Sequence, residues 1–214
     1  MGVFDADRFR AALSAWAAGD PAAAGAARAR AAGLTTIILV EGVSDLAALE
    51  ALAALRGRDL AADGVCVVPM GGAMSIARFL RVLSAGRLAV GVRGLFDVGE
   101  EEYARRALAG IGREPGPGRA GLADLGFFVC EADLEDELIR ALGHDGVERV
   151  LDAGRDLARF RLFQNQPAQR GRPMDRQLRR FLGTTSGRKA AYARRLTLAL
   201  DPARVPAPLE GAIA

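Results

Sequence analysis

Residues 35–45 read Thr35-Thr36-Ile37-Ile38-Leu39-Val40-Glu41-Gly42-Val43-Ser44-Asp45, and this stretch decides the fold. Its first part is rich in β-branched side chains and predicts a buried strand over 34–40. The strand ends in the carboxylate of Glu41 and turns on Gly42. An Ala- and Leu-rich segment follows and predicts a helix over 44–56, with Ser44 as its expected N-cap. The order predicts a strand–turn–helix unit that presents Glu41 at the carboxyl end of a strand.

Two further apolar runs also end in acidic residues. The run over 88–96 is followed by Asp97, and the run over 125–130 is followed by Glu131-Ala132-Asp133-Leu134-Glu135. In an open sheet of parallel strands, ligands bind outside the carboxyl ends of the strands. We therefore expect the acids from the three strand ends to converge on one metal-binding pocket.

Strand-like and helix-like segments alternate through the first two thirds of the chain. Strands are predicted over 34–40, 64–69, 88–96 and 125–130, and helices over 44–56, 73–85, 100–110 and 133–142. Residues 112–121 are rich in Gly, Pro and Arg and predict a loop. This alternation predicts an α/β fold: a Rossmann-like, mostly parallel, four-stranded sheet with helices on both faces.

The remaining segments suggest four parts. Residues 1–33 form an N-terminal helical segment, with helices expected over 4–18 and 21–32, and residues 34–145 form the α/β domain. Residues 146–204 form a basic helical subdomain, with helices expected over 146–163, 173–182 and 187–200. Residues 205–214 form a tail that, with its several prolines from Pro202 onward, is expected to be loosely ordered.

Composition excludes several classes of protein. The chain has 214 residues, half of them hydrophobic, but no apolar run of the ~20 residues that a membrane helix needs. The first residues lack the pattern of a signal peptide, so we expect a cytoplasmic protein that makes no membrane contact. Cys66 and Cys130 are isolated, which argues against a zinc site or a disulfide framework and favours buried free thiols.

The net charge of +3 conceals a strong division along the chain. Residues 155–204 carry 13 Arg and Lys against 3 Asp and Glu, a net charge of +10. The other residues carry 16 against 23, a net charge of −7. An acidic part suited to divalent cations is thus joined to a basic part suited to phosphates.

The acidic residues at the strand ends are the candidate metal ligands: Glu41, Asp45, Asp97, Glu100, Glu101, Asp133 and Glu135. Carboxylate oxygens favour Mg²⁺ or Mn²⁺ over zinc. Several of these residues have an ordinary alternative role, because acids are also enriched in the first turn of a helix. We expect Glu100 and Glu101 to share a single ligand role.

The basic part contains the candidate phosphate contacts. Arg172, Arg176, Arg179 and Arg180 follow the spacing of one helical face, and Arg188 precedes Lys189, the single lysine of the chain. A lysine near bound metal can stabilise the charge that develops on a phosphodiester in the transition state. The alternative for the arginines is a solvated helix face, and for Lys189 a surface cation.

The order strand-Glu-Gly, strand-Asp and then an acidic cluster resembles a TOPRIM domain, the metal-binding fold of topoisomerases and DnaG-type primases. The finer resemblance, over roughly residues 34–200, is to the TOPRIM domain of the overcoming-lysogenization-defect (OLD) nucleases. It is carried by Val40-Glu41-Gly42-x-Ser44-Asp45, by Asp133-Leu134-Glu135 at the start of a helix, and by a lysine in the C-terminal helices. The resemblance implies a metal-dependent nuclease, with Glu41 as ligand or acid/base and Lys189 as a catalytic residue.

Two features depart from that family. TOPRIM domains usually carry Asp-x-Asp after the third strand, whereas this chain has Asp97-Val98-Gly99, so Glu100 or Glu101 would have to supply the second carboxylate. OLD nucleases usually also carry an ABC-type ATPase, for which this sequence has no segment. Residues 183–189 resemble a phosphate loop, but with the wrong spacing, no Ser or Thr at position 190 and no preceding strand.

We therefore expect a stand-alone TOPRIM protein that cleaves or nicks DNA with Mg²⁺ or Mn²⁺ in a two-metal carboxylate site. It would work with a separate ABC-type ATPase or as a homodimer. One alternative is a non-catalytic module that binds metal or nucleic acid and partners an ATPase. Another is a nucleotidyl transferase, because fold alone does not select the reaction.

Overall fold

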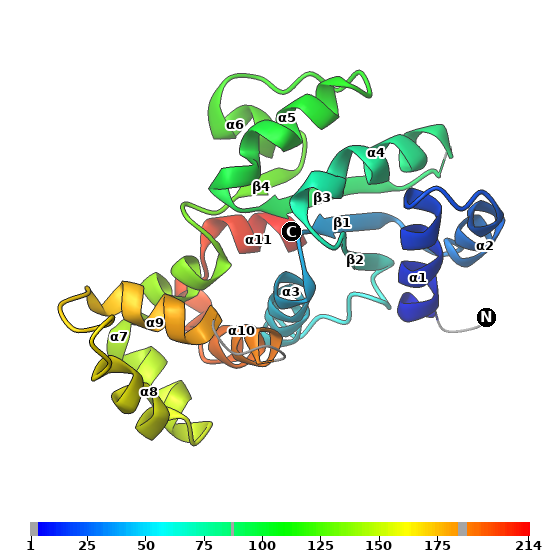
Figure 1. Ribbon diagram of the computed structural model, residues 1–214. Helices are drawn as coiled ribbons and strands as arrows, with labels where there is room; N and C mark the ends of the chain where they lie inside the picture. The colour runs from blue at the N-terminus through cyan, green and yellow to red at the C-terminus, as the bar shows by residue number, and fades with distance from the viewer. Residues whose placement is uncertain (1–3, 87, 184–187) are drawn as a thin grey trace.

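The computed structural model describes residues 4–86, 88–183 and 188–214, and it contains the predicted α/β core (Figure 1). The strands are β1 (Thr36–Val40), β2 (Val65–Pro69), β3 (Gly91–Phe96) and β4 (Phe127–Val129). They form one sheet of order β2-β1-β3-β4 in which every pair is parallel. The predicted fold class is therefore confirmed. No helix among the described residues is long and apolar enough to cross a membrane.

Eleven α-helices and three short 3-10 turns are described along the chain. The helices are α1 (Ala6–Ala17), α2 (Ala22–Arg30), α3 (Val43–Leu55), α4 (Ile76–Ala85), α5 (Glu101–Ala109), α6 (Gly118–Ala123), α7 (Leu134–Ala153), α8 (Leu157–Gln164), α9 (Met174–Gly183), α10 (Lys189–Leu198) and α11 (Ala207–Ile213). The 3-10 turns are η1 (Ala73–Ser75), η2 (Val98–Glu100) and η3 (Pro202–Arg204).

Alternate residues of β1 serve two separate hydrophobic cores. Ile38 and Val40 pack into the cluster formed with α3, α7, α10 and α11, whereas Ile37 and Leu39 pack into the cluster formed with α1, α4, α5 and α6. Because successive side chains of a strand point to opposite faces, each cluster covers one face of the sheet. In Figure 1, α4 and α5 accordingly lie above the sheet, and α3 and α10 lie below it.

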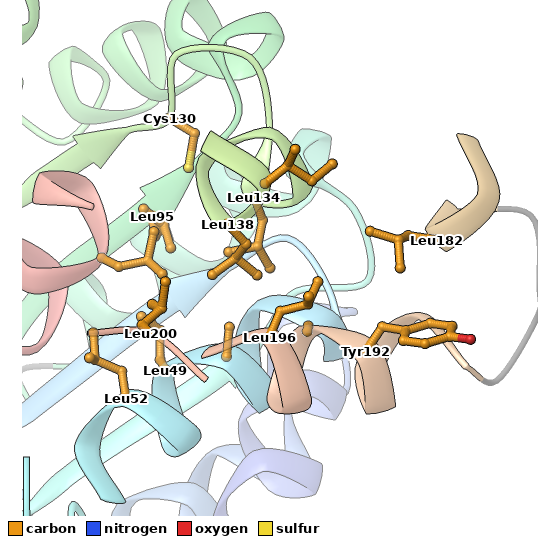
Figure 2. Close-up of a cluster of buried hydrophobic side chains, with 14 of the residues drawn as sticks. Leu49, Leu52, Leu95, Cys130, Leu134, Leu138, Leu182, Tyr192, Leu196 and Leu200 are labelled. Carbon is orange, nitrogen blue, oxygen red and sulfur yellow. The ribbon is translucent and has the colours of Figure 1, made fainter. Parts of the chain in front are cut away.

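The C-terminal helices share the first of these cores with the sheet. Figure 2 shows Leu49 and Leu52 of α3 gathered with Leu95 of β3 and with Leu196 of α10. Helix α7 carries the chain from the sheet edge into the helical part and is interrupted at Gly143, whose φ of 68° and ψ of 166° are not helical. Packing against α3 thus gives the basic segment a fixed position relative to the sheet.

Several local predictions were wrong. The helix expected over 146–163 is instead the end of α7 and most of α8, separated by residues 154–156. The tail is not loose: η3 and α11 order it, and Leu209, Ala212 and Ile213 are buried against the sheet and α3. The prolines at 202, 206 and 208 suit the first turns of these short helices, where a missing N–H costs nothing. The predicted loop over 112–121 contains the start of α6, whose Leu122 is fully buried.

The predicted N-cap of α3 was also wrong. Gly42 occupies that position with extended backbone, and Ser44 is buried at the second helical residue. The carboxylate of Asp45 accepts a hydrogen bond of 2.8 Å from the Gly42 N–H. An acid at the third helical position therefore does the capping that was expected of the serine.

The free edge of the sheet at β2 is covered by α1. Arg10 donates from Nε to the carbonyl of Val67 at 2.7 Å, and its Nη2 lies 2.7 Å from Glu50 Oε1 on α3. Pro69 ends this strand, as expected for an edge position. The guanidinium thus satisfies a strand carbonyl and ties α1 to α3.

Gly94 lets the aromatic core close beside β3. Its N–H donates to the Gly126 carbonyl at 3.0 Å, and a Cβ at this position would lie 2.5 Å from a ring atom of Phe96 and 2.6 Å from one of Phe127. Those two rings are stacked with centroids 6.0 Å apart. Only glycine therefore fits between the strand and the ring pair.

We expect Gly94→Ala to lower the free energy of unfolding by about 1–3 kcal/mol, the usual result of overpacking a core. Urea denaturation followed by circular dichroism measures it. Gly25→Ala is the matched control, because a Cβ at that position of α2 meets no atom within 4 Å and alanine favours the helix. Equal stability of Gly94→Ala and the natural protein would contradict the packing argument.

Candidate metal centre

The carboxyl edge of the sheet contains a topological switch point between β1 and β3. The chain runs from β1 to β2 on one side, and then crosses to β3 on the other side of β1. The loops that follow β1 and β3 therefore diverge and leave a crevice, which is where α/β proteins bind ligands. Glu41 follows β1 and Asp97 follows β3, so both lie at this crevice.

Three carboxylates meet at the switch point. Glu41, Asp97 and Glu100 are each partly buried, and each offers an oxygen within 4.8 Å of those of the other two. Glu100 reaches the group because the short turn η2 brings it back toward Asp97. The second acid expected after the third strand is thus supplied one residue beyond Gly99.

Asp45 lies at the rim of this group and is itself almost fully buried. Its hydrogen bond from Gly42 fixes the carboxylate beside the first turn of α3, where the helix dipole favours negative charge. Burial is the main cause that raises the pKa of Asp45 to about 6, and the nearby charges of Glu135 and Glu41 raise it further. Asp45 therefore carries charge that its surroundings compensate incompletely.

The electrostatic cost is largest at Asp97. Burial, followed by the charges of Asp45, Asp133, Glu100 and Glu41, raises the pKa of Asp97 to about 8. The pKa of Glu100 is also raised, mainly by burial and then by Glu41. Like charges held this close disfavour one another's ionised forms. The group is thus prepared for a positive partner.

Lys189 supplies one such charge from α10. Its Nζ lies 3.2 Å from Oε1 of Glu135, a buried acid in the first turn of α7. Partial burial lowers the pKa of Lys189, but the carboxylates of Glu135, Asp45 and Asp97 outweigh that effect and raise it overall. The lysine therefore remains a cation, and α10 reaches the acidic edge through it.

Two other predicted ligands have different partners. Asp133 caps α7 by accepting from the Asp136 N–H at 2.8 Å, and its other oxygen pairs with Arg179 of α9. Glu101 lies 3.2 Å from Arg105 and 3.5 Å from Arg119. Of the pair expected to share one role, it is thus Glu100 that lies with Glu41 and Asp97.

The donor set fits a divalent cation. Oε2 of Glu100 is buried and accepts no hydrogen bond from any residue that the structure describes, which is costly for a carboxylate oxygen. The candidate ligands are all hard oxygens, as Mg²⁺ and Mn²⁺ prefer. A cation at Glu41, Asp97 and Glu100 would satisfy that oxygen and offset the mutual repulsion.

The predicted arginine face is only partly as expected. Arg176 and Arg180 are exposed on α9, but Arg172 precedes the helix and donates to the Ala168 carbonyl. The helix begins at Met174, after the stripe has begun, because the residue before Pro173 is disfavoured in helical conformation. Arg188 lies 3.2 Å from Asp156. The phosphate-loop lookalike includes residues 184–187, which lie outside the described residues.

Sequence analysis missed Glu137. This acid is buried in α7, accepts from the Glu131 N–H at 2.7 Å and lies 2.6 Å from Arg140. It shapes the loop between β4 and α7, which the Val98 N–H also joins by donating to the Ala132 carbonyl at 3.3 Å. No local signal separates Glu137 from the other first-turn acids, because its partner lies six residues earlier in a loop.

The raised pKa values predict a pH-dependent stability when divalent cations are absent. Protonated Asp97 and Asp45 favour the fold, so their contribution is complete below about pH 4 and is lost as the pH rises through about 6 and about 8. In EDTA, Asp97→Asn should therefore melt roughly 2–4 °C above the natural protein at pH 8.5. The two should melt alike at pH 4, as measured by differential scanning calorimetry.

The same experiment contains its own control. Adding Mg²⁺ at pH 8.5 should raise the melting temperature of the natural protein more than that of Asp97→Asn, since ligand binding stabilises the folded state. An Asp97→Asn advantage that is identical at pH 4 and pH 8.5 would show that the carboxylate charge is not its cause.

Known proteins resemble this chain both in sequence around the site and in fold. Residues 35–98 match the family described as overcoming lysogenization defect protein-like, TOPRIM domain. No significant match was found among curated proteins. The matched segment runs from β1 to the residue after Asp97 and thus includes two of the three clustered carboxylates.

Solved structures agree over most of the chain. The C-terminal region of the Burkholderia pseudomallei OLD protein superposes with a TM-score of 0.60 at 19% identity, covering 84% of this chain and 95% of that one. The C-terminal region of the Xanthomonas campestris pv. campestris OLD protein gives a TM-score of 0.58 at 22% identity, with 83% and 92% covered. At these identities the likeness concerns the fold. Together with the matched segment, it shows that this chain carries a TOPRIM domain that resembles the one in OLD proteins.

Proposed function

We propose that this protein is a Mg²⁺- or Mn²⁺-dependent phosphodiesterase that cleaves or nicks DNA. The observation that carries the proposal is the group of Glu41, Asp97 and Glu100 at the switch point of the sheet, with oxygens within 4.8 Å of one another. The TOPRIM match supports it, because nucleases occur among proteins with this domain. In this proposal the protein works with a separate ABC-type ATPase or as a homodimer.

The residues have distinct roles in this proposal. Glu41, Asp97 and Glu100 would hold the first cation, and Asp45 and Glu135 are the candidate ligands of a second. A cation bound there would activate a water molecule and neutralise phosphodiester oxygens. Glu41 is also the candidate acid or base, because it ends a rigid strand at the crevice. Lys189 lies beside Glu135 and would stabilise charge that develops on the phosphate.

DNA would approach the acidic edge across the C-terminal helices. Residues 155–204 carry a net charge of +10, while the remaining residues carry −7. Arg179 is the exception among the α9 arginines, since its ion pair with Asp133 joins α9 to the start of α7. Arg176 and Arg180 are exposed and contact phosphates in this proposal.

A second candidate function is binding without cleavage. Gly99 stands where TOPRIM domains usually carry an aspartate, and the longer side chain of Glu100 takes its place. If Glu100 holds a cation less firmly, the protein would bind nucleic acid and leave the chemistry to another component. The cleavage test below separates the two candidates, because a binding module would retain DNA without cutting it.

We expect Glu41→Gln to reduce Mg²⁺-dependent DNA cleavage at least ~100-fold, because the amide neither binds a cation as strongly nor exchanges a proton. The melting temperature should change little, since Glu41 lies at the crevice rather than in a core. Conversion of a supercoiled plasmid to nicked and linear forms measures cleavage. Glu102→Gln on the exposed side of α5 is the matched control and should cleave normally.

Full activity in purified Glu41→Gln would contradict the site. Cleavage that persists in excess EDTA would contradict the metal requirement. An inactive natural protein that still binds DNA would favour the binding module.

The arginines of α9 give a separate prediction for binding. Each neutralised phosphate contributes about 0.9 to the slope of log affinity against log salt concentration. Arg176→Ala with Arg180→Ala should therefore flatten that slope by roughly two units, as measured by fluorescence anisotropy with duplex DNA in EDTA. Arg30→Ala with Arg81→Ala removes the same charge from α2 and α4 and should leave the slope unchanged. Equal slopes in both double variants would identify the α9 arginines as a solvated face.

A further inference from the structure

A second pocket, distinct from the acidic centre, lies among the C-terminal helices. Its volume is about 370 Å³, and it opens between the end of α7, the start of α8 and one side of α10. The side chains that define its chemistry are Arg155, Arg159, Arg188, Arg195, Asp156 and Tyr192. Four guanidinium groups and one carboxylate give this lining a formal charge of +3. A pocket of this sign attracts anions.

Asp156 is a buried carboxylate that contacts three of the other lining side chains. It is 6% exposed and accepts a hydrogen bond of 2.5 Å from the Tyr192 hydroxyl. Its Oδ1 lies 3.0 Å from Arg159 and 3.2 Å from Arg188. The hydrogen bond from Tyr192 is the main cause that lowers the pKa of Asp156, so the carboxylate stays charged. One buried acid thus holds two guanidinium groups in place.

The other two arginines have no such partner. Among the residues that the structure describes, Arg155 and Arg195 form no ion pair with a carboxylate, although both are at the pocket wall. Gly154 makes room for one of them, because a Cβ there would lie 2.8 Å from Nη1 of Arg195. Two cations are therefore gathered beside an already basic pair without an acid to balance them.

The backbone conformation of Arg155 is also unusual. This residue directly follows the α7 C-cap and has a φ of +60°, the left-handed conformation that helix ends normally give to glycine. It is the one residue other than glycine with a positive φ among those that the structure describes. Strained non-glycine residues of this kind cluster at functional sites, which directs attention to the side chain. Arginine at this position is thus less favourable for the fold than glycine, and its side chain lines the pocket.

We propose that this pocket binds a phosphoryl group. Guanidinium groups match phosphate oxygens in charge and in paired hydrogen-bond geometry. The lining is poorly suited to a nucleobase, because its one aromatic ring, that of Tyr192, is 3% exposed. Two sources share this chemistry: a backbone phosphate of DNA and a free phosphate or diphosphate. The first source rests on the proposed function, and the second does not.

The position of the pocket favours the first source. Arg188 and Lys189 are consecutive residues, yet Arg188 reaches Asp156 in the pocket and Lys189 reaches Glu135 at the acidic edge. Two consecutive residues at the start of α10 therefore reach the two sites. A strand whose scissile phosphate lies at the carboxylates would place a neighbouring phosphate at the arginines.

Titration of the whole chain with inorganic pyrophosphate in EDTA, followed by calorimetry, tests the pocket without any cleavage. Arg155→Gln with Arg195→Gln should weaken pyrophosphate binding at least 10-fold. Arg149→Gln with Arg194→Gln is the matched control: it removes the same charge from exposed positions of α7 and α10 outside the pocket and should bind normally.

The salt dependence of duplex DNA binding in EDTA separates the sources. If a backbone phosphate of DNA occupies the pocket, the slope of log affinity against log salt concentration falls by about 0.9 or more in Arg155→Gln with Arg195→Gln. It does not fall in the control variant. If only pyrophosphate binding is lost, the source is a free phosphate. Equal effects of the two variants on both probes would overturn the proposal. Because neither probe requires catalysis, failure of the nuclease assignment gives a different result.

Arg155→Gly tests whether weaker pyrophosphate binding results from a loss of stability rather than from a loss of the guanidinium. It removes one guanidinium and places glycine at a left-handed position, so the melting temperature should be maintained or increased. Pyrophosphate affinity should nevertheless fall several-fold. A variant that is destabilised, or that is stable and binds pyrophosphate as well as the natural protein, would overturn the role of Arg155.

Discussion

Parallel pairing between β1 and β3 sets the spacing of Glu41 and Asp97, and the chemistry of the carboxyl edge depends on that spacing. The register that aligns Val40 with Leu95 brings the two strand ends to within one residue of each other. Backbone hydrogen bonds and two hydrophobic cores hold the strands against the repulsion of the acids that follow them. Gly94 contributes because it lets the rings of Phe96 and Phe127 stack beside the strand. The fold thus maintains a charge arrangement that the isolated side chains would avoid.

The basic helices complete this balance of charge. Lys189 pairs with Glu135 in the first turn of α7, and Arg179 pairs with its N-cap Asp133, so α10 and α9 are each joined to the start of α7 by an ion pair. These contacts are partly exposed, so their value lies more in position than in stability. They orient the positive part of the chain toward the acidic edge, which is the arrangement that the proposed phosphodiesterase site requires.

The sequence was sufficient to predict the α/β core, because each strand is a short apolar run followed by an acid or a glycine turn. It also placed Glu41 and Asp97 together, since carboxyl ends of parallel strands share one edge. It could not distinguish Glu100 from Glu101, because that choice depends on how η2 turns the backbone and on Arg105 and Arg119. Helix α11 could not be predicted for a similar reason. Two apolar residues, Leu209 and Ile213, do not make a helical pattern in the sequence, and the helix is stabilised by the surface of the sheet that buries them.

The contact between Arg10 and Val67 has a consequence for assembly. An exposed edge strand is a template on which another chain can add a strand, and proteins commonly block such edges with charged side chains. Here the Arg10 guanidinium occupies one outward carbonyl of β2, that of Val67, and α1 packs beside the strand. Growth of the sheet past β2 would require α1 to leave. The fold itself thus blocks continuous intermolecular β-structure at β2. Association of this chain with a copy of itself would use helix surfaces or the other edge of the sheet, at β4.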